Sequence, residues 1–378
     1  MYLKKLHLRS FRNYLDRQVE FTARKTILVG NNAQGKSNLL EAVELLATLK
    51  SHRSSRDREL VLDTATIGQI EAVVERTHST NELSILFRKQ GRRTVALNRE
   101  NLRRQLDFLG VLNAVQFSSL DLDLVRGTPD TRRTWLDGLL IQLEPIYSSI
   151  LQQYNHILRQ RNALLKKIRT VKQDESLESV DIFEPQLKLW DEQLASAGSR
   201  VTRRRARVIA RLAPIAESWH QRISGETEQL QINYLPNVEW TEDEAAKVQQ
   251  AFLAKINERR MVEQYQGRTV VGTHRDEIEF TINQTPARYY GSQGQQRTLV
   301  LALKLAELKL IEEVIGEPPL LLLDDVLAEL DLNRQQQLLE VIGDRFQTII
   351  TTTHIDSFNR DWIQDSQVLK IQAGTITS

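Results

Sequence analysis

The chain has 378 residues, of which 40% are hydrophobic and 26% are charged, the balance of a soluble globular protein of one large or two ordinary domains. Its 51 Lys and Arg nearly cancel its 49 Asp and Glu, so the net charge of +2 requires no nucleic-acid partner, and any such surface must be a local patch. The absence of cysteine excludes disulfides, thiolate metal sites and cysteine nucleophiles.

The N-terminal residues 1–9 carry charges inside their apolar stretch. A signal peptide needs an unbroken apolar core, so this segment predicts a strand instead. No uncharged apolar run approaches the roughly 18–20 residues of a membrane span. We therefore expect a cytoplasmic protein without a membrane partner.

Residues 1–125 are the first of three parts into which the sequence divides. The buried strand predicted over Thr26–Val29 is followed by a glycine-rich turn and by an amphipathic helix whose apolar residues run from Leu39 to Leu49. Farther on, Leu83–Arg88 and Thr94–Asn98 alternate apolar and polar residues, which predicts a hairpin.

The glycine-rich turn matches the P-loop pattern in full. Its residues are Gly30, Asn31, Asn32, Ala33, Gln34, Gly35, Lys36 and Ser37. The glycines let backbone N–H groups turn toward phosphates at the start of a helix, whose dipole favours an anion. Lys36 can reach the β- and γ-phosphates, and the Ser37 hydroxyl can ligate Mg²⁺. A chance match would not require the strand before it and the helix after it, so we predict that the turn binds ATP with Mg²⁺.

Residues 126–266 read as an inserted helical lobe. Apolar residues recur at alternating steps of three and four from Tyr147 to Ile168 and from Leu187 to Trp219, with breaks at Arg161 and near Arg204. This spacing predicts two antiparallel helices that form a short hairpin arm. A third helix is expected from Thr241, with a capping box completed three residues later.

The same lobe holds a local excess of basic residues. From position 126 to position 211 there are 16 Lys and Arg against 10 Asp and Glu. Positive charge at this density can bind DNA phosphates without reading bases. The candidate contacts are Arg203, Arg204, Arg205, Arg132 and Arg133. A solvated helix face has the same composition, and the residues alone leave both interpretations open.

Residues 267–378 alternate strands and helices. Strands are expected at Ile278–Ile282, Leu320–Leu323, Gln347–Thr353 and Val368–Gln372, with helices at Gln293–Ile315 and Leu332–Ile342. This order predicts an α/β fold with a mainly parallel sheet, shared with residues 1–125 as one discontinuous lobe.

Two carboxylates, Asp324 and Asp325, follow four consecutive leucines. Such a run needs burial on both faces, as in a central parallel strand, and its carboxyl end lies where open α/β sheets bind ligands. We assign Asp324 to Mg²⁺ and Asp325 to the polarisation of an attacking water. Two solvated acids at a strand end are the alternative, which the P-loop disfavours.

Three further segments follow the order of an ABC-type ATPase. The candidate residues are Ser292, Gln293 and Gly294 of a signature, Glu329 and Asp331 of a D-loop, and His354 as a switch histidine. A signature would approach a nucleotide held by another subunit. Ser292 could equally be an ordinary N-cap, and a lone histidine is usually structural.

The layout resembles SMC-like ATPases of DNA repair, and its short arm resembles the RecF family in particular. Residues 123–137 and 322–334 are similar to two long RecF motifs, with Thr128 as a mild departure in the first. Residues 10–14 and 272–276 are similar to shorter RecF segments. The resemblance covers the whole chain and implies an ABC/SMC-type ATPase head with an inserted arm.

The resemblance also carries functional expectations. It implies a weak, DNA-stimulated ATPase that forms an ATP-dependent homodimer, binds duplex or gapped DNA, and works with RecO and RecR in gap repair, replication restart and SOS induction. It places Arg12, and by analogy Arg53, near the nucleotide phosphates. It makes Gln116 a candidate Q-loop ligand of Mg²⁺, and a buried polar residue at a strand end is the equal alternative.

Two other functions share this nucleotide chemistry. An ATPase subunit of a membrane transporter has roughly half as many residues between P-loop and signature, and no counterpart of the motif around Gly127. A related nuclease would need a catalytic domain, for which too little chain follows Asp331. A DNA-repair ATPase is therefore the main hypothesis.

Overall fold

The computed structural model describes residues 1–54, 56–173, 180–327, 330–355, 358 and 360–377. They form two compact units. The head unit comprises Met1–Leu122, Ile215–Gln229 and Gly291–Ser378, and the inserted unit comprises Asp123–Pro214 and Leu230–Tyr290. These bounds differ from the expected 1–125, 126–266 and 267–378, because 215–229 belongs with the head unit and 267–290 with the inserted unit.

The head unit contains the expected parallel sheet, in the order β15-β14-β3-β13-β12-β8. Its strands are β3 (Lys25–Val29), β8 (Ala114–Ser118), β12 (Leu320–Asp324), β13 (Thr348–Thr352), β14 (Ser366–Gln372) and β15 (Thr375–Thr377). Strand β12 lies between β8 and β13 and pairs parallel with both. Its four leucines are at most 1% exposed, which confirms the central strand.

Three long helices complete this part: α1 (Lys36–Thr48), α8 (Gln293–Ile315) and α9 (Leu332–Ile342). Helix α1 packs on β8, β12 and β13, and Ser37 in its first turn contacts Asp324 at the carboxyl end of β12. The bounds expected for α8 and α9 are confirmed. A short helix, α10 (Arg360–Gln364), precedes β14.

A second, antiparallel sheet of the head unit has the order β2-β1-β4-β5-β6-β7. Its strands are β1 (Tyr2–Phe11), β2 (Tyr14–Glu20), β4 (Ile67–Arg76), β5 (Ser79–Arg88), β6 (Thr94–Leu97) and β7 (Glu100–Asn101). The predicted N-terminal strand and the hairpin of β5 and β6 are both present. Short helices η1 (Asp57–Leu60), η2 (Gln105–Asp107) and η3 (Ser119–Leu122) lie in the connections.

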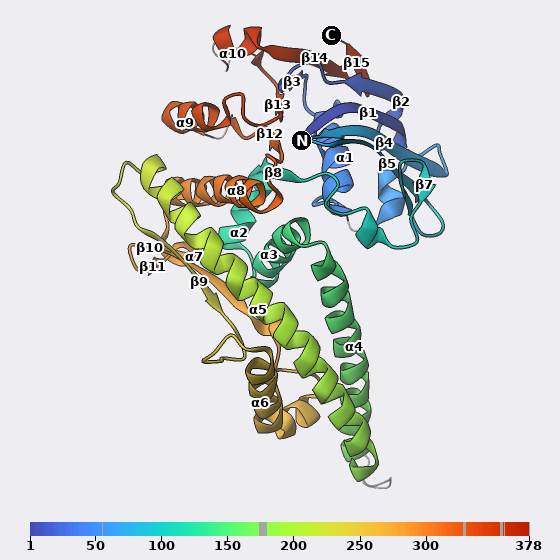
Figure 1. Ribbon diagram of the computed structural model, residues 1–378, viewed down its shortest axis with the longest axis vertical. Helices are drawn as coiled ribbons and strands as arrows, with labels where there is room; N and C mark the ends of the chain where they lie inside the picture. Colours follow the sequence, from blue (N-terminus) through green and yellow to red (C-terminus); the bar gives the residue numbers. More distant parts are fainter. Residues whose placement is uncertain (55, 174–179, 328–329, 356–357, 359, 378) are drawn as a thin grey trace. The chain divides into compact units, whose positions relative to one another are not determined.

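The inserted unit is built on the predicted helical hairpin of α4 (Ile146–Gln173) and α5 (Glu184–Ile223), which run side by side (Figure 1). The last turns of α5, from Ile215, count with the head unit. The other helices are α2 (Asp123–Arg126), α3 (Pro129–Leu143), η4 (Val180–Phe183), α6 (Ala245–Gln266), η5 (Thr273–Arg275) and α7 (Ala287–Tyr290).

Two expectations for this unit were wrong. The strand expected at 278–282 is β10 (Glu277–Ile282), and it pairs antiparallel with β9 (Leu230–Leu235) and β11 (Thr285–Pro286) in a small sheet, not in the parallel one. The alternation of buried Leu230 and Ile232 with exposed neighbours marks β9 in the sequence. Helix α6 begins at Ala245, with Glu244 at its N-cap and no capping box.

The gaps in the two apolar stripes are filled by buried arginines. Arg161 of α4 lies at helical spacing between apolar residues but is wholly buried. Its Nε and Nη2 atoms donate to Asp191 of α5 at 2.7 Å and to Glu263 of α6 at 2.6 Å. Burial alone lowers the pKa of Arg161, but the charges of Glu263 and Asp191 outweigh it and raise the pKa above its usual value. One guanidinium thus joins three helices.

Arg161→Met is expected to lower the free energy of unfolding by about 3–5 kcal/mol, because it leaves buried carboxylates without their partner. Arg159→Met, two residues away but exposed, should change it by less than about 0.5 kcal/mol. Urea unfolding of both variants tests this. A loss under about 1 kcal/mol for Arg161→Met would mean that this ion pair does not hold the three helices together.

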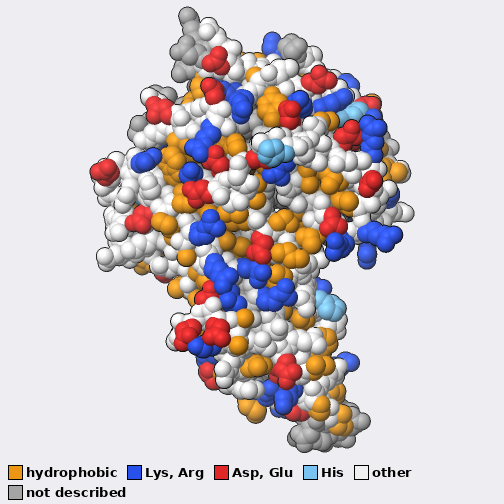
Figure 2. Space-filling view, viewed as in Figure 1, with side chains coloured by type: hydrophobic (Ala, Val, Ile, Leu, Met, Phe, Trp, Pro, Cys, Tyr) orange, Lys and Arg blue, Asp and Glu red, His pale blue; other side chains and the backbone are white. Residues whose placement is uncertain are grey.

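Positive and negative side chains are interspersed over the face shown in Figure 2, as the nearly balanced composition predicts. Among the described residues, no helix is long and apolar enough to cross a membrane.

Candidate functional site

The P-loop lies between the end of β3 and the start of α1. Gly35 takes the left-handed conformation (φ 116°), which a glycine adopts without strain. A Cβ atom at Gly30 would stand 2.3 Å from the Ile371 carbonyl oxygen, so that position also requires glycine. Lys36 Nζ donates to the carbonyls of Gly30 at 2.7 Å and Asn31 at 3.1 Å. The Lys36 side chain therefore lies along the P-loop, where it is predicted to contact the nucleotide phosphates.

Two neighbouring segments hold the loop. Asn13 Nδ2 donates to the Gln34 carbonyl at 2.9 Å, and the Tyr14 hydroxyl donates to the Gly35 carbonyl at 2.9 Å. From the C-terminal side, the Gly374 N–H donates to the Gln34 carbonyl at 3.0 Å. Only the resemblance to a RecF segment had singled out residues 10–14, and these contacts give their physical role.

The side chains of Ser37 and Asp324 contact each other at the carboxyl end of the parallel sheet. The Ser37 hydroxyl donates to Asp324 Oδ1 at 2.8 Å, although 287 residues separate the two. A hydroxyl and a carboxylate at this separation fit Mg²⁺, which takes oxygen ligands. Two of the three residues that the sequence assigned to the metal, Ser37 and Asp324, are thus brought together.

Thr351 of β13 is a site residue that sequence reasoning missed. Its hydroxyl donates to Asp324 Oδ1 at 2.8 Å and accepts from the Asp325 N–H at 2.9 Å. The register of β12 and β13 pairs Asp324 with Thr351, so the signal lay in the threonine run that ends the neighbouring strand. Thr351 therefore orients the Asp324 carboxylate and fixes the backbone of Asp325.

Asp325 has a left-handed backbone (φ 54°), a conformation that aspartate tolerates better than most residues. Burial raises the pKa of Asp325, the Lys36 charge lowers it, and the Asp324 charge raises it, for a net rise. A carboxylate with a raised pKa next to Lys36 suits a group that polarises water.

His52 and Gln116 form a polar contact near Asp324. Gln116 Nε2 lies 3.4 Å from His52 Nε2, and Gln116 Oε1 is buried with no hydrogen-bond partner among the described residues. Burial lowers the pKa of His52, but its hydrogen bond to Glu44 and the charges of Glu44, Glu41 and Asp324 outweigh this and raise it. The metal role of Gln116 stays a prediction.

The structure engages Arg12 elsewhere. Its guanidinium makes two hydrogen bonds to the buried carboxylate of Glu41, at 2.8 and 2.6 Å. Arg53 donates to Asn38 in α1 at 2.8 Å. A phosphate contact by Arg12 would have to be made beside its pair with Glu41, and it stays a prediction.

The signature residues form the start of α8. Ser292 is its N-cap: its Oγ accepts from the Gln295 N–H at 3.2 Å, and Gln295 Oε1 accepts from the Ser292 N–H at 2.8 Å. Gln293 and Gly294 lie in the first turn of the helix. The alternative function of Ser292 as an N-cap is thus confirmed, and a contact to a second subunit stays compatible with it.

Arg334 connects the signature with the D-loop. Asp331 caps α9 by accepting from the Arg334 N–H at 3.0 Å. Arg334 Nε donates to Thr298 of α8 at 3.0 Å, and its Nη2 lies 3.5 Å from the Gly294 carbonyl. The other D-loop residue, Glu329, lies outside the described residues. His354 follows β13 and is exposed, with its N–H donating to the Thr352 hydroxyl at 3.2 Å.

The five arginines predicted to contact DNA are instead paired with acids or carbonyls of their own unit. Arg205 and Arg132 are buried, at 3% and 4% exposure. Arg205 joins Asp137 and Asp276, and Arg132 joins Glu277. Both are therefore structural, which corrects their assignment.

The other three are partly exposed but also engaged. Arg203 pairs with Asp243, Arg204 pairs with Glu144 at 3.0 Å, and Arg133 pairs with Asp130 at 3.0 Å. Their charges are offset locally, which weakens them as phosphate contacts.

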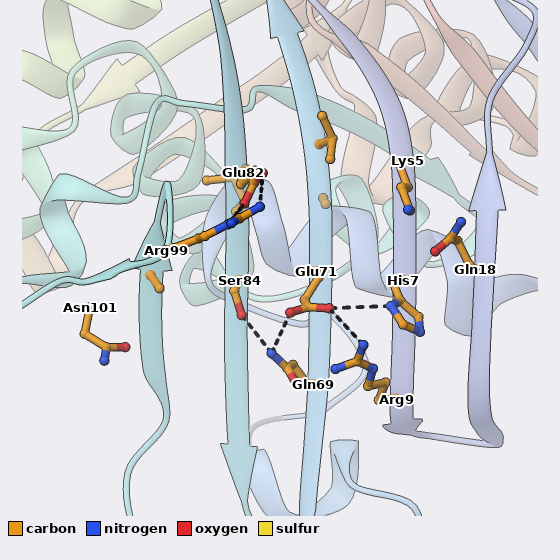
Figure 3. A pocket seen from close by; sticks show the side chains of 14 residues that line it. Lys5, His7, Arg9, Gln18, Gln69, Glu71, Glu82, Ser84, Arg99 and Asn101 are labelled. Atoms are coloured by element: carbon orange, nitrogen blue, oxygen red, sulfur yellow. Dashed lines mark hydrogen bonds and ion pairs between the residues drawn. The ribbon is translucent and has the colours of Figure 1, made fainter.

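A hollow of about 630 Å³ lies on one face of the antiparallel sheet (Figure 3). Its lining carries both signs of charge: Glu71 contacts His7 and Arg9, and Glu82 pairs with Arg99. None of the predicted site residues lines it. Its mixed charge gives no preference for an anion.

Comparisons with known proteins agree along the whole chain. The family model of the RecF/RecN/SMC N terminal domain matches residues 2–376. A protein of Gloeothece citriformis called "DNA replication and repair protein RecF" is 70% identical over 381 residues, which cover 100% of this chain and 99% of that protein. The protein of the same name from Rippkaea orientalis is 69% identical, with the same coverage.

Solved structures show the same relationship. The recombination mediator protein RecF with ATPrS has a TM-score of 0.90 at 33% identity, covering 99% of this chain and 97% of that one. RecF with ATP has a TM-score of 0.89 at 32% identity, covering 100% and 97%. The Smc head domain of Pyrococcus furiosus, with a TM-score of 0.54 at 16% identity and coverage of 100% and 95%, shares the fold alone.

Proposed function

The chain belongs to the RecF/RecN/SMC family of ATPases, and from that premise we propose that it is an ATP-gated DNA clamp of recombinational repair. ATP binding drives two copies together on DNA, and slow hydrolysis releases them. The proposal rests on the hydrogen bond between Ser37 and Asp324. This contact joins the P-loop to the carboxyl end of β12 in one nucleotide site.

Each residue has a role in that site. Backbone N–H groups of the loop and of the start of α1 bind the phosphates. The Lys36 ammonium group, which donates to loop carbonyls in this structure, donates to the phosphates when ATP binds. Ser37 and Asp324 hold Mg²⁺, which neutralises phosphate charge. Asp325, whose backbone N–H donates to Thr351, polarises the attacking water.

The second half of each site comes from the partner copy. Ser292, Gly294 and Asp331 lie at the starts of α8 and α9, and Arg334 holds these two helix starts together. Presented as one surface, they would complete the nucleotide site of the other copy. Because ATP is then bound more tightly by the dimer, linkage requires ATP to favour the dimer.

The partners and the pathway rest on family membership. We infer that the protein acts in the cytoplasm with RecO and RecR in gap repair, replication restart and SOS induction. The transporter alternative has no support, because the family model spans nearly the whole chain.

The proposed function is tested by DNA retention. Fluorescence anisotropy of a labelled gapped duplex should show tight binding with ATP and Mg²⁺ and weak binding with ADP or without nucleotide. Equal binding in all three states would contradict ATP gating.

A further inference from the structure

The composition of α4 departs from the rest of the chain. Its 28 residues include six Lys and Arg and no Asp or Glu, although the whole chain has 51 basic and 49 acidic residues. The basic residues are Arg159, Arg161, Lys166, Lys167, Arg169 and Lys172. A helix that is merely solvated carries both signs, so this bias needs a cause.

Three of the six basic residues are engaged within the inserted unit. Arg161 is neutralised by Asp191 and Glu263. Arg169 and Lys172 donate to uncharged acceptors of α6, the Gln266 carbonyl at 3.3 Å and the Gln264 side chain at 2.7 Å. These two contacts leave the positive charge uncompensated.

The other three, Arg159, Lys166 and Lys167, are exposed and form no ion pair with any residue that the structure describes. Lys166 and Lys167 follow Arg159 by seven and eight positions, about two helical turns, so all three point to one side of the helix. Two acids that pack against α4 are engaged elsewhere: Asp191 and Glu263 bind Arg161, and Asp191 also binds Arg260.

Helix α5 contributes one further exposed cation beside α4. Arg200 is exposed and reaches Gln153 of α4 at 3.5 Å, and the structure shows it in no ion pair with the described acids. Between Gln153 and Lys167 the helix rises about 21 Å. The exposed amide side chains of this stretch include those of Asn155 and Gln160, and the stretch contains no Asp or Glu. We call Arg159, Lys166, Lys167 and Arg200 the α4 face.

We propose that the α4 face is a phosphate-contacting surface for duplex DNA. The inference rests on the proposed function and locates its DNA contacts, for which the paired arginines of α5 are weaker candidates. Uncompensated cations along some 20 Å, with amides between them, suit the backbone of a duplex, which carries one charge per about 1.7 Å.

The structure favours a duplex over a single strand. Single-strand sites stack bases on exposed aromatic rings. The two aromatic residues of α4, Tyr147 and Tyr154, are at most 1% exposed. Contacts made by the α4 face are therefore to phosphates, without reading of sequence.

The test replaces the cations of α4 with a neutral helix former, in the variant Arg159→Gln, Lys166→Gln, Lys167→Gln. Binding of a 30-base-pair duplex to the full-length protein is measured with ATP and Mg²⁺ across a salt series. The slope of log affinity against log salt should fall by roughly two to three units, because each lost phosphate contact removes about 0.9. Two duplexes of unrelated sequence should be affected equally.

The matched control is Arg203→Gln, Arg204→Gln, Arg207→Gln, which removes the same charge from arginines paired with Asp243 and Glu144. Its salt slope should change by less than one unit. An unchanged slope in the α4 variant, or an equal fall in the control, would overturn the α4 face while leaving ATP-gated binding intact.

Two further measurements distinguish failure of the proposed function from binding of a different ligand. If the parent protein binds no DNA in any nucleotide state, the proposed function itself fails. If polyglutamate or a 30-nucleotide single strand competes as well as the duplex, the face is an acidic-protein or single-strand site, and the duplex assignment is wrong. ATP-dependent association should be unchanged in the α4 variant, which shows that it is folded.

Discussion

Lys36→Met should reduce ATP hydrolysis by at least about a hundredfold and abolish ATP-dependent association. The lysine is 4% exposed and contacts only loop carbonyls in the described structure, so its charge is available for phosphates. Removing one preorganised charged donor from a phosphoryl-transfer site typically costs a factor of about 10²–10³. Methionine matches the four-atom apolar stem of lysine and lacks only the ammonium group, so thermal unfolding should be little changed.

Lys50→Met is the matched control, because Lys50 is exposed just beyond the end of α1. It should hydrolyse ATP and associate as the parent does. Steady-state phosphate release and equilibrium nucleotide binding measure both variants. If Lys36→Met hydrolyses ATP at a rate within tenfold of that of the parent, the assignment of the P-loop to ATP hydrolysis is wrong.

Asp325→Asn is expected to slow hydrolysis about a hundredfold or more while ATP still binds, so that the ATP-bound dimer persists. The amide keeps the shape of the side chain but cannot take a proton from water. Phosphoryl transfer depends on positioning and charge, and a displacement of about 1 Å can cost on the order of a hundredfold. Since most ABC-type ATPases have Glu here and Asp is shorter by one methylene, turnover of the parent should already be slow.

Asp63→Asn, an exposed aspartate of the head unit, is the control and should leave hydrolysis unchanged. Single-turnover hydrolysis and the lifetime of the dimer are measured on the same samples. If Asp325→Asn hydrolyses ATP as fast as the parent, Asp325 does not position the water and the carboxylate assignment is wrong.

Features encoded by local spacing were predictable from the sequence. The strand, turn and helix around Lys36 and the leucine run before Asp324 follow from short patterns with a physical meaning. The bounds of α8 and α9 were predictable for the same reason, because Ser292 and Asp331 cap these helices. Cap residues act on neighbouring backbone groups, so their effect appears in the sequence itself.

Features set by distant pairing were not predictable. Arg205 looked like part of a basic surface, but Asp137 and Asp276 neutralise it from two other segments. Arg12 is committed to Glu41 in the same way. One local signal was available: Arg161 and Arg205 occupy the gaps in regular apolar stripes, where a helix faces its neighbours. A charged residue at such a position indicates a buried pair, not a surface.

The central claim, that ATP completes its sites by joining two copies, is tested most directly by sedimentation velocity of the parent and of Ser292→Arg, each with and without ATP and Mg²⁺. The parent should sediment as a monomer without nucleotide and as a dimer with ATP. Ser292→Arg should bind ATP yet remain a monomer, because the arginine would occupy the space of the partner's phosphates. An Arg variant that dimerises with ATP as the parent does would contradict the composite site.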